Sequence, residues 1–417
     1  MAKKYHLAWL LAGILGLSSI PTAHGDEADT QRDIALKLNE ITGTSSIEGR
    51  LRQLIRDEAG TKKLIEAAIK LAKEKPQPFN YTAAFLLART AHANKDFASA
   101  EVFFKIASEQ ALKLQSANKI LQVYDGLIDL FYDNKKFDDA IKACKEFLEL
   151  NNTDPSNPIN RAKPFVMERM IQSLAKKGKT EEALKLAQEL VDADEGGWYF
   201  VRLKAEVYRE AGQLDDAAKA YEDTLDRLKK MKDLEEERRD RFSRGVRYTL
   251  SSVYVDLKKI DKAAEQLQAL LKNDPDNPTF NNDLGFIWAD HDMKLDESEK
   301  LIRKAIDEDR KQRKKIENLT PEEDKDNPAY LDSLGWVLFK KKSYKEAKKH
   351  LLEAIEQMDG QHIEILDHLA DVHMALDEKS EAIKVWEKAL KLEDLSKREK
   401  DRRVEVEKKL KKAQGSK

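Results

Sequence analysis

The chain has 417 residues, of which 36% are charged, 10 are proline and 16 are glycine, and its formal net charge is -2 at pH 7. Acidic and basic residues nearly balance, so the chain has no overall positive field that would attract nucleic acid. A composition rich in Lys, Glu, Leu and Ala favours one continuous helical body over sheets or domains separated by linkers.

Residues 1–25 have the pattern of a secretory signal peptide. Two lysines precede an apolar run from Leu7 to Ile20, and the segment ends in the small residues Ala23 and Gly25, at the positions that a signal peptidase reads. The run is shorter than the roughly 20 apolar residues that cross a bilayer as a helix. We therefore expect residues 1–25 to be cleaved on export, which leaves a periplasmic or secreted chain without a membrane span.

Cys144 is the only cysteine of the chain. It has no partner for a disulfide within the chain, and no cysteine directly follows the apolar run, so a lipid anchor at the N-terminus is not expected. We expect its thiol to be a small apolar group on a buried helix face.

Two short segments precede the main body of the chain. We expect residues 26–45 to be disordered. Residues 46–80 predict an N-terminal cap of two short amphipathic helices that end at Pro76.

The body of the chain repeats itself. Three stretches show this most clearly: "NNDLGFIWADHD" from Asn281, "LDSLGWVLFKKK" from Leu331 and "LDHLADVHMALD" from Leu366. Each has a leucine followed by a small residue, an apolar helical segment, a polar turn and a second helix with a small residue near its start. Two helices that cross closely need small residues at the crossing point, so the pattern predicts helical pairs.

The small residues can be traced through eight such pairs. In the second helices they are Ala100, Ala140, Ala183, Ala217, Ala263, Ser298, Ala347 and Ala382. The matching first-helix positions are Ala88, Ile128, Ile171, Ala205, Ser251, Gly285, Gly335 and Ala370, of which the two isoleucines depart from the pattern.

This pattern resembles the tetratricopeptide repeat family, whose unit of about 34 residues pairs two antiparallel helices. The resemblance covers residues 81–391. It implies an all-α fold, a right-handed superhelical solenoid of about eight helix-turn-helix units.

Charged segments interrupt and follow the repeats. Residues 226–242 and 309–328 are insertions dense in mixed charge, which we interpret as second helices extended into solvent. Thr320 to Glu323 in the second insertion has a helix-start signature. Residues 392–417 predict a charged C-terminal helix that opens with a capping box from Ser396 to Glu399 and solvates the end of the array.

Catalytic and metal-binding patterns are weak in this sequence. The Gly-Lys-Thr within residues 176–183 resembles part of a phosphate loop, but no strand precedes it, so we interpret it as a helix–helix turn. His362, His368 and His373 lack the four-residue spacing that places two metal ligands on one helix face. The consecutive residues Asp290, His291 and Asp292 point in different directions, so they are not expected to converge on one metal ion. We expect no cofactor and no metal site.

The resemblance also implies a binding surface, because the first helices of tetratricopeptide proteins line a concave face that holds extended peptides or short helices. Carried over residue by residue, it implies an acidic floor with aromatic residues in the last three repeats. Its members are Asn282, Phe286 and Asp290, then Asp332, Trp336 and Phe339, then Glu364, Asp367 and Asp371. Such a floor suits a protein partner that is basic, or both basic and apolar. Alternatively, the acids only solvate the helices and Trp336 packs against the adjacent repeat.

The sequence thus predicts a non-catalytic scaffold of the bacterial cell envelope that binds a protein or peptide. The envelope location follows from a resemblance of "LGFIWADHD" and "YLDSLGWVLF" to bacterial exported tetratricopeptide proteins. One alternative is a metal-dependent enzyme, or enzyme subunit, that uses the His and Asp groups of residues 283–373. Another is a structural protein that associates with itself through the ends of the array.

Overall fold

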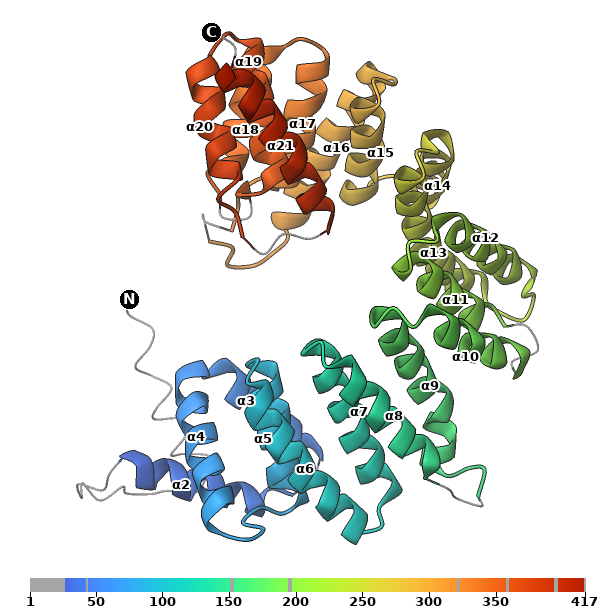
Figure 1. Cartoon of the computed structure of the whole chain (residues 1–417), viewed down its shortest axis with the longest axis vertical. Coiled ribbons are helices and arrows are strands. Elements are labelled where there is room, and N and C mark those ends of the chain that lie inside the picture. Colours follow the sequence, from blue (N-terminus) through green and yellow to red (C-terminus); the bar gives the residue numbers. More distant parts are fainter. Residues whose placement is uncertain are drawn as a thin grey trace. The chain divides into compact units, whose positions relative to one another are not determined.

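The computed structural model describes most of the chain, and the regular elements that it describes are helices (Figure 1). The described residues are 27–42, 44–150, 154–193, 197–320, 323–357, 360–393 and 397–415. The predicted signal peptide of residues 1–25 lies outside them, as does Ser396 of the predicted capping box. The prediction of an all-helical chain of helix-turn-helix repeats is confirmed.

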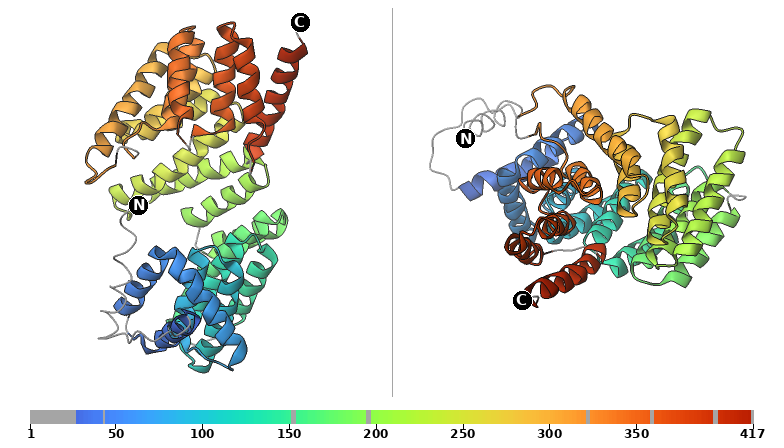
Figure 2. Two further views of the ribbon diagram at one scale, coloured as in Figure 1. Left: turned by 90° about the vertical axis from the view of Figure 1, so that its left-hand side faces the viewer. Right: turned by 90° about the horizontal axis from the view of Figure 1, so that it is seen from above.

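The chain divides into two units within helix α10 (Thr180–Ala193). The first unit ends at Ala187 and the second begins at Gln188. Both units are built from antiparallel helical pairs, and Figure 2 shows the helices from α15 to α21 of the second unit side by side.

The first helices that the structure describes lie in the expected disordered leader and in the expected N-terminal cap. They are α2 (Glu27–Lys37), the 3-10 turn η1 (Leu38–Glu40), α3 (Thr44–Arg56) and α4 (Glu58–Glu74). Ala35 and Leu38 are buried in the core of the first unit. The side chain of Asn39 accepts a hydrogen bond from the backbone of Asn80 at 2.8 Å. The disorder prediction for residues 26–45 is therefore wrong for α2 and η1, because an apolar stripe ties them to the repeats.

Within the described residues, eight helical pairs follow this N-terminal segment. Figure 1 labels their helices from α5 to α20. Those before the division in α10 are α5 (Tyr81–Ala93) with α6 (Phe97–Lys113), α7 (Ala117–Asp133) with α8 (Phe137–Glu149), and α9 (Pro158–Lys176) with α10. Those after it are α11 (Trp198–Glu210) with α12 (Leu214–Lys230), α13 (Glu236–Asp256) with α14 (Ile260–Asn273), α15 (Pro278–Asp290) with α16 (Leu295–Arg313), α17 (Pro328–Lys340) with α18 (Tyr344–Ile355), and α19 (Ile363–Ala375) with α20 (Lys379–Ala389). Helix α21 (Lys397–Gly415) follows the last pair.

The predicted small residues lie at the helix crossings. All eight of the second-helix set are completely buried, from Ala100 to Ala382. At Gly285, a Cβ atom would lie 2.9 Å from the carbonyl oxygen of Ser298 on the partner helix. At Gly335 it would lie 2.5 Å from Cγ of Leu351. These distances leave no room for a side chain, so glycine permits the close crossing.

Each helical pair closes with the same turn. The second residue after the first helix adopts a left-handed backbone, with φ between 54° and 80°. The next amide N–H donates to a carbonyl five residues earlier at 2.7–2.9 Å, as in Met293 to Trp288 and Ser343 to Leu338. This is the hydrogen bond of a Schellman motif, which ends a helix by satisfying its last carbonyl groups. Gly178 adopts this backbone in residues 176–183, so the phosphate-loop-like stretch is a helix–helix turn.

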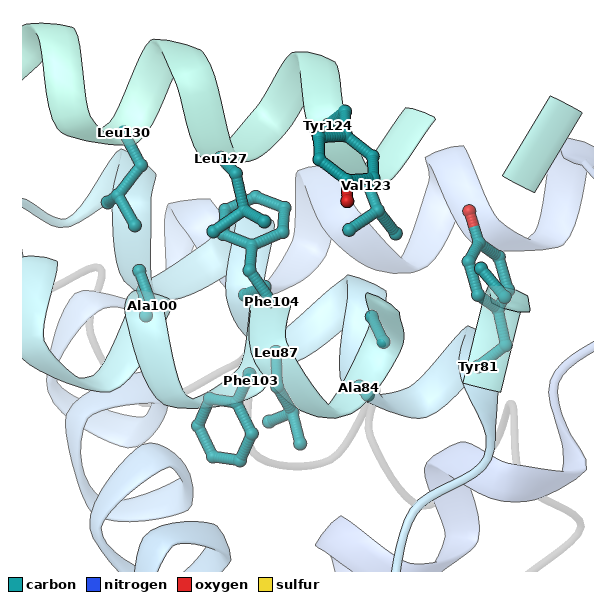
Figure 3. Packing of buried hydrophobic residues seen from close by; sticks show 14 of the residues in the cluster. Tyr81, Ala84, Leu87, Ala100, Phe103, Phe104, Val123, Tyr124, Leu127 and Leu130 are labelled. Atoms are coloured by element: carbon teal, nitrogen blue, oxygen red, sulfur yellow. The ribbon is translucent and has the colours of Figure 1, made fainter. Parts of the chain in front are cut away.

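Large apolar side chains fill the space between successive pairs. In the first unit, Phe104 of α6 reaches toward α7 beside Leu127 (Figure 3). Phe103 and Phe104 are fully buried, and Cys144 of α8 belongs to the same core. Burial raises the pKa of the Cys144 thiol to about 12. The prediction of a buried, apolar role for this cysteine is confirmed.

The charged insertions differ from the predicted solvent-exposed second helices. The first insertion mainly lengthens the following first helix, because α13 begins at Glu236 and has 21 residues. In the second insertion, α16 ends at Arg313 and the chain then forms a loop. In this loop, Thr320 and Glu323 exchange hydrogen bonds, with their backbone N–H groups donating at 2.9 and 3.3 Å. The described residues from Glu323 form turns instead of the predicted helix, since α17 starts only five residues later at Pro328.

Gly285→Ala tests the close crossing. We expect it to lower the free energy of unfolding by about 1–3 kcal/mol, because the added methyl group overpacks the crossing. Gly245→Ala is the control: it lies inside α13 with no other atom within 4 Å of a Cβ, and it should raise the free energy of unfolding by about 0.5–1 kcal/mol. Urea denaturation measures both. If both substitutions changed the free energy of unfolding in the same direction, this would contradict the proposed crossing.

Candidate functional site

In the second unit, polar side chains of neighbouring first helices bind one another. The hydroxyl of Tyr248 on α13 donates to Oδ2 of Asp283 on α15 at 2.8 Å. Nε1 of Trp336 on α17 donates to Oδ1 of Asp290 on α15 at 3.0 Å. Nδ1 of His368 on α19 lies 2.8 Å from Oδ1 of Asp332 on α17. Many side chains on this face are therefore already engaged by the next repeat.

An aromatic cluster forms around His368. Its ring stacks on Trp336 at a centroid distance of 4.0 Å, and Trp336 stacks on Phe339 at 4.9 Å. Phe286 lies 6.4 Å from the His368 ring. Trp336 is 8% exposed and His368 is fully buried. This arrangement agrees with the alternative stated for the sequence, in which Trp336 packs against the adjacent repeat. The tryptophan fills the interface between the two repeats.

His368 is a buried titratable group held by one carboxylate. Burial alone would lower its pKa, but the charge of Asp332 and the hydrogen bond to it outweigh the burial, so the pKa of His368 lies above its ordinary value. The Nε2 atom has no hydrogen-bond partner within the described chain. The contact with Asp332 thus favours a charged imidazolium inside the repeat interface.

The acids of the last repeat are covered by the C-terminal helix. Asp367 of α19 is completely buried and accepts hydrogen bonds from Trp386 Nε1 at 2.9 Å and from Lys409 Nζ at 2.8 Å. Lys409 also contacts Oδ2 of Asp371 at 2.6 Å. Arg402 contacts Glu364 at 2.7 Å. Both cations come from α21, so a basic helix of the same chain occupies this part of the predicted binding face.

The nine residues predicted to line the binding face therefore do not form one open floor. Asp332, Trp336 and Phe339 meet Phe286 around His368, whereas Asp367 and Asp371 lie under α21. Asn282 is 6% exposed, and its Nδ2 donates to Asp283 at 3.3 Å. The expected open acidic floor is wrong, because side chains of neighbouring helices satisfy these groups. Partner binding by these residues stays a prediction.

A groove lies open between α13 and α15, and we name it the α13–α15 groove. It has a volume of about 450 Å³. Its lining combines apolar side chains, hydroxyl groups and three carboxylates: Val255, Phe286, Ile287, Thr249, Ser252, Asp256, Asp283 and Asp290, with Tyr248, Arg209 and His291 also contributing. Three carboxylates against one guanidinium make the groove acidic at neutral pH.

Asp283 and Tyr248 form one wall of the groove. Burial raises the pKa of Asp283, although hydrogen bonds from Tyr248 and Asn282 oppose the shift. Burial also raises the pKa of Tyr248, and the nearby charge of Asp283 adds to this. The phenol thus stays protonated and donates to the carboxylate, and Tyr248, which lines the groove, is 40% exposed.

The α13 side of this groove was missed in the sequence, although a signal for it exists. Relative to the small residue Gly285, Asn282 lies three positions before, Phe286 one position after and Asp290 five positions after. The same offsets from Ser251 select Tyr248, Ser252 and Asp256, which line the groove. Applying one register to the fifth repeat as well as the sixth would have found them.

The histidines of the proposed metal-dependent alternative do not converge. Nδ1 of His291 lies 2.9 Å from the carbonyl of Ile287, and His373 lies 2.6 Å from Glu378. Within the stretches that the structure describes, no three His, Cys, Asp or Glu side chains form a group that could hold a metal ion. These stretches also contain no helix long and apolar enough to cross a membrane.

Comparison with known proteins identifies the repeats. A family model described as tetratricopeptide repeat matches residues 169–230 and 248–313. These two segments are tetratricopeptide repeats. A TPR repeat-containing protein of Pseudomonas aeruginosa is 27% identical over 124 residues, which are 30% of this chain and 18% of that protein.

Two solved structures show the extent of structural similarity. A tetratricopeptide repeat protein from Parabacteroides merdae aligns with a TM-score of 0.46 and 16% identity, over 68% of this chain and 98% of that one. MamA from Desulfovibrio magneticus, from residue 41 to its end, aligns with a TM-score of 0.36 and 19% identity, over 46% of this chain and 93% of that one.

Repeats of this family indicate a protein-interaction scaffold as the coarse function of the chain. Stacked repeats present extended surfaces to which other proteins bind. Every residue that lines the α13–α15 groove lies in a segment that the family model matches. Arg209 lies in the first segment, and the others lie in the second.

Asp332→Asn tests the charged state of His368. Because the folded pKa of His368 is raised, protonation stabilises the fold; this stabilisation is complete below the unfolded pKa of about 6.5 and is lost as pH rises through the folded pKa. We expect the substitution to cost about 3–5 kcal/mol at pH 6, as for a broken buried ion pair, and less as the pH is raised.

Urea unfolding at several pH values between pH 6 and pH 9 measures this cost. The matched control is Asp292→Asn, since Asp292 is exposed and pairs with Lys340 at the surface. It should change the free energy of unfolding by at most about 1 kcal/mol. If the cost of Asp332→Asn did not depend on pH, His368 would not carry the charge that we assign to it.

Proposed function

We propose that this chain is a non-catalytic scaffold that binds a segment of a partner protein in the α13–α15 groove. One observation carries the proposal: the groove exposes apolar and acidic side chains together on the face formed by the first helices. Elsewhere on this face, contacts such as His368 with Asp332 fill the interface between repeats.

The groove suits a segment with both apolar and basic side chains. Val255 and Phe286 offer apolar contacts, while Asp256 and Asp290 supply negative charge at the same level of the two helices. Asp256 is exposed, and one oxygen of Asp290 already accepts from Trp336. A lysine or arginine beside an apolar residue would complement this arrangement, since interfaces combine apolar anchors with matched charge.

We also propose that the scaffold works in the bacterial cell envelope. The support is the signal-peptide pattern of residues 1–25. The chain isolated from the envelope fraction of its host should begin at residue 26, which intact-mass spectrometry measures. A chain found in the cytoplasm with residues 1–25 still attached would refute this location.

Ser252→Trp tests the groove directly. Ser252 is exposed and lines the groove, so an indole there should fill the space without removing a packing contact. We expect capture of the partner from an envelope extract to weaken at least about tenfold. Asp256→Lys should have a similar effect if the partner segment is basic, because it reverses a charge that faces the bound segment.

Ser380→Trp is the matched control, because Ser380 is an exposed serine on α20, outside the groove. Circular dichroism should show equal helicity for all variants. If Ser252→Trp captured the same proteins as strongly as the Ser380→Trp control, the α13–α15 groove would not be the binding site.

A further inference from the structure

Helix α21 binds the last repeat as an amphipathic helix binds a partner. Val406, Leu410 and Ala413 are buried, and their spacing of four and three residues places them on one helix face. They belong to one apolar cluster with residues of α19 and α20, including Leu366 and Trp386. We call the surface beneath them the α19/α20 surface.

Two cations flank this apolar stripe. Arg402 and Lys409 are seven residues apart, two helical turns, and therefore share a face of α21. Arg402 contacts Glu364 at 2.7 Å and Asp367 at 3.3 Å. Lys409 contacts Asp367 at 2.8 Å and Asp371 at 2.6 Å. The α19/α20 surface therefore recognises a definite pattern of apolar and basic side chains.

The apolar contacts that hold α21 are few for its length, and its further polar contacts include Glu399 with His362 at 2.8 Å and Arg403 with the carbonyl of Leu392 at 3.4 Å. Among its described side chains, α21 has three buried apolar ones in a helix of 19 residues, whereas α17 has six in a helix of 13 residues. Its main packing partners are α19 and α20 alone among the described helices. A single helix of this length is marginally stable in water, so α21 forms and docks through the same few contacts. A competing helix with the same pattern could replace it.

The surface that α21 covers has the composition of a binding hot spot. Trp386 is 3% exposed beneath α21, and its Nε1 donates to Asp367 at 2.9 Å. Ile363 and Leu366 add apolar area, and Glu364 and Asp371 border it with negative charge. A buried tryptophan with apolar neighbours and a charged border is typical of sites that dominate protein binding.

We propose that the α19/α20 surface is an exchangeable docking site for a basic amphipathic helix of a partner protein, with α21 as its resident occupant. The partner helix carries two cations seven residues apart and an apolar stripe between and beyond them. It lays this face on α19 and α20 as α21 does, a helix-in-groove mode of recognition. This site is separate from the α13–α15 groove and does not depend on the function proposed for it.

The experiment measures binding of a fluorescent peptide of residues 397–415 to the full-length chain by anisotropy. In the wild-type chain, α21 competes with the peptide. Arg402→Glu combined with Lys409→Glu in the chain places acids against Glu364, Asp367 and Asp371 and should release α21. We expect this variant to bind the wild-type peptide at least about tenfold more tightly than the wild-type chain does.

Two controls isolate the site. Lys408→Glu with Lys411→Glu makes the same charge change on the exposed face of α21 and should leave peptide affinity at the wild-type level. Asp367→Asn with Asp371→Asn, added to the released variant, should abolish the gained binding. Hydrogen exchange reports whether α21 is released, and Val406→Asp with Leu410→Asp releases it by a second route if the charge reversal does not.

Three results would overturn the proposal. The first is a released α21 with no gain in peptide binding. The second is a gain in peptide binding that persists when Asp367 and Asp371 are both replaced by asparagine. The third is a wild-type chain that dimerises in light scattering and loses the dimer when Arg402→Glu and Lys409→Glu are introduced, since a second copy would then be the occupant. Circular dichroism confirms that each variant keeps the remaining helices.

Discussion

The close crossing of two helices in each repeat is the constraint on which the other contacts depend. At Gly285 and Gly335 the partner helix leaves no space for a Cβ atom, and Ala88 and Ala370 are completely buried at the same place. Where a small residue occupies this position, it determines which side of the first helix faces its partner. The side chains next to it then face the neighbouring first helix, and their sizes and charges decide whether that interface is closed or open.

The α13–α15 groove has a simple origin in this register. One residue after the small residue, α15 carries Phe286 and α17 carries Trp336, whereas α13 carries Ser252. The tryptophan stacks on His368 and closes its interface, but the serine is too small to reach across. At α19 the same position is Asp371, which binds Lys409 of α21. One position therefore produces a packed interface, an ion pair or a groove, according to its side chain.

The sequence predicts the repeats well because each crossing depends on residues within one helical pair. It predicts the first-helix face poorly, because those contacts join residues far apart: Trp336 and Asp290 are separated by 46 positions, and Lys409 and Asp367 by 42. The offset from the small residue indicates the face of each side chain but not its partner. Helix α21 looked like a solvating cap because three apolar residues are few among so many charges, yet their spacing already describes a packing face.

Carboxylate labelling measures most directly whether the first-helix face is closed except at the groove. A carbodiimide and an amine modify accessible Asp and Glu side chains of the folded full-length chain, and mass spectrometry gives the rate at each residue. Asp256 should be labelled rapidly, because it is exposed in the groove, and Asp332 and Asp367 should be protected by His368 and by α21. Labelling of Asp332 and Asp367 as fast as Asp256 would contradict the account.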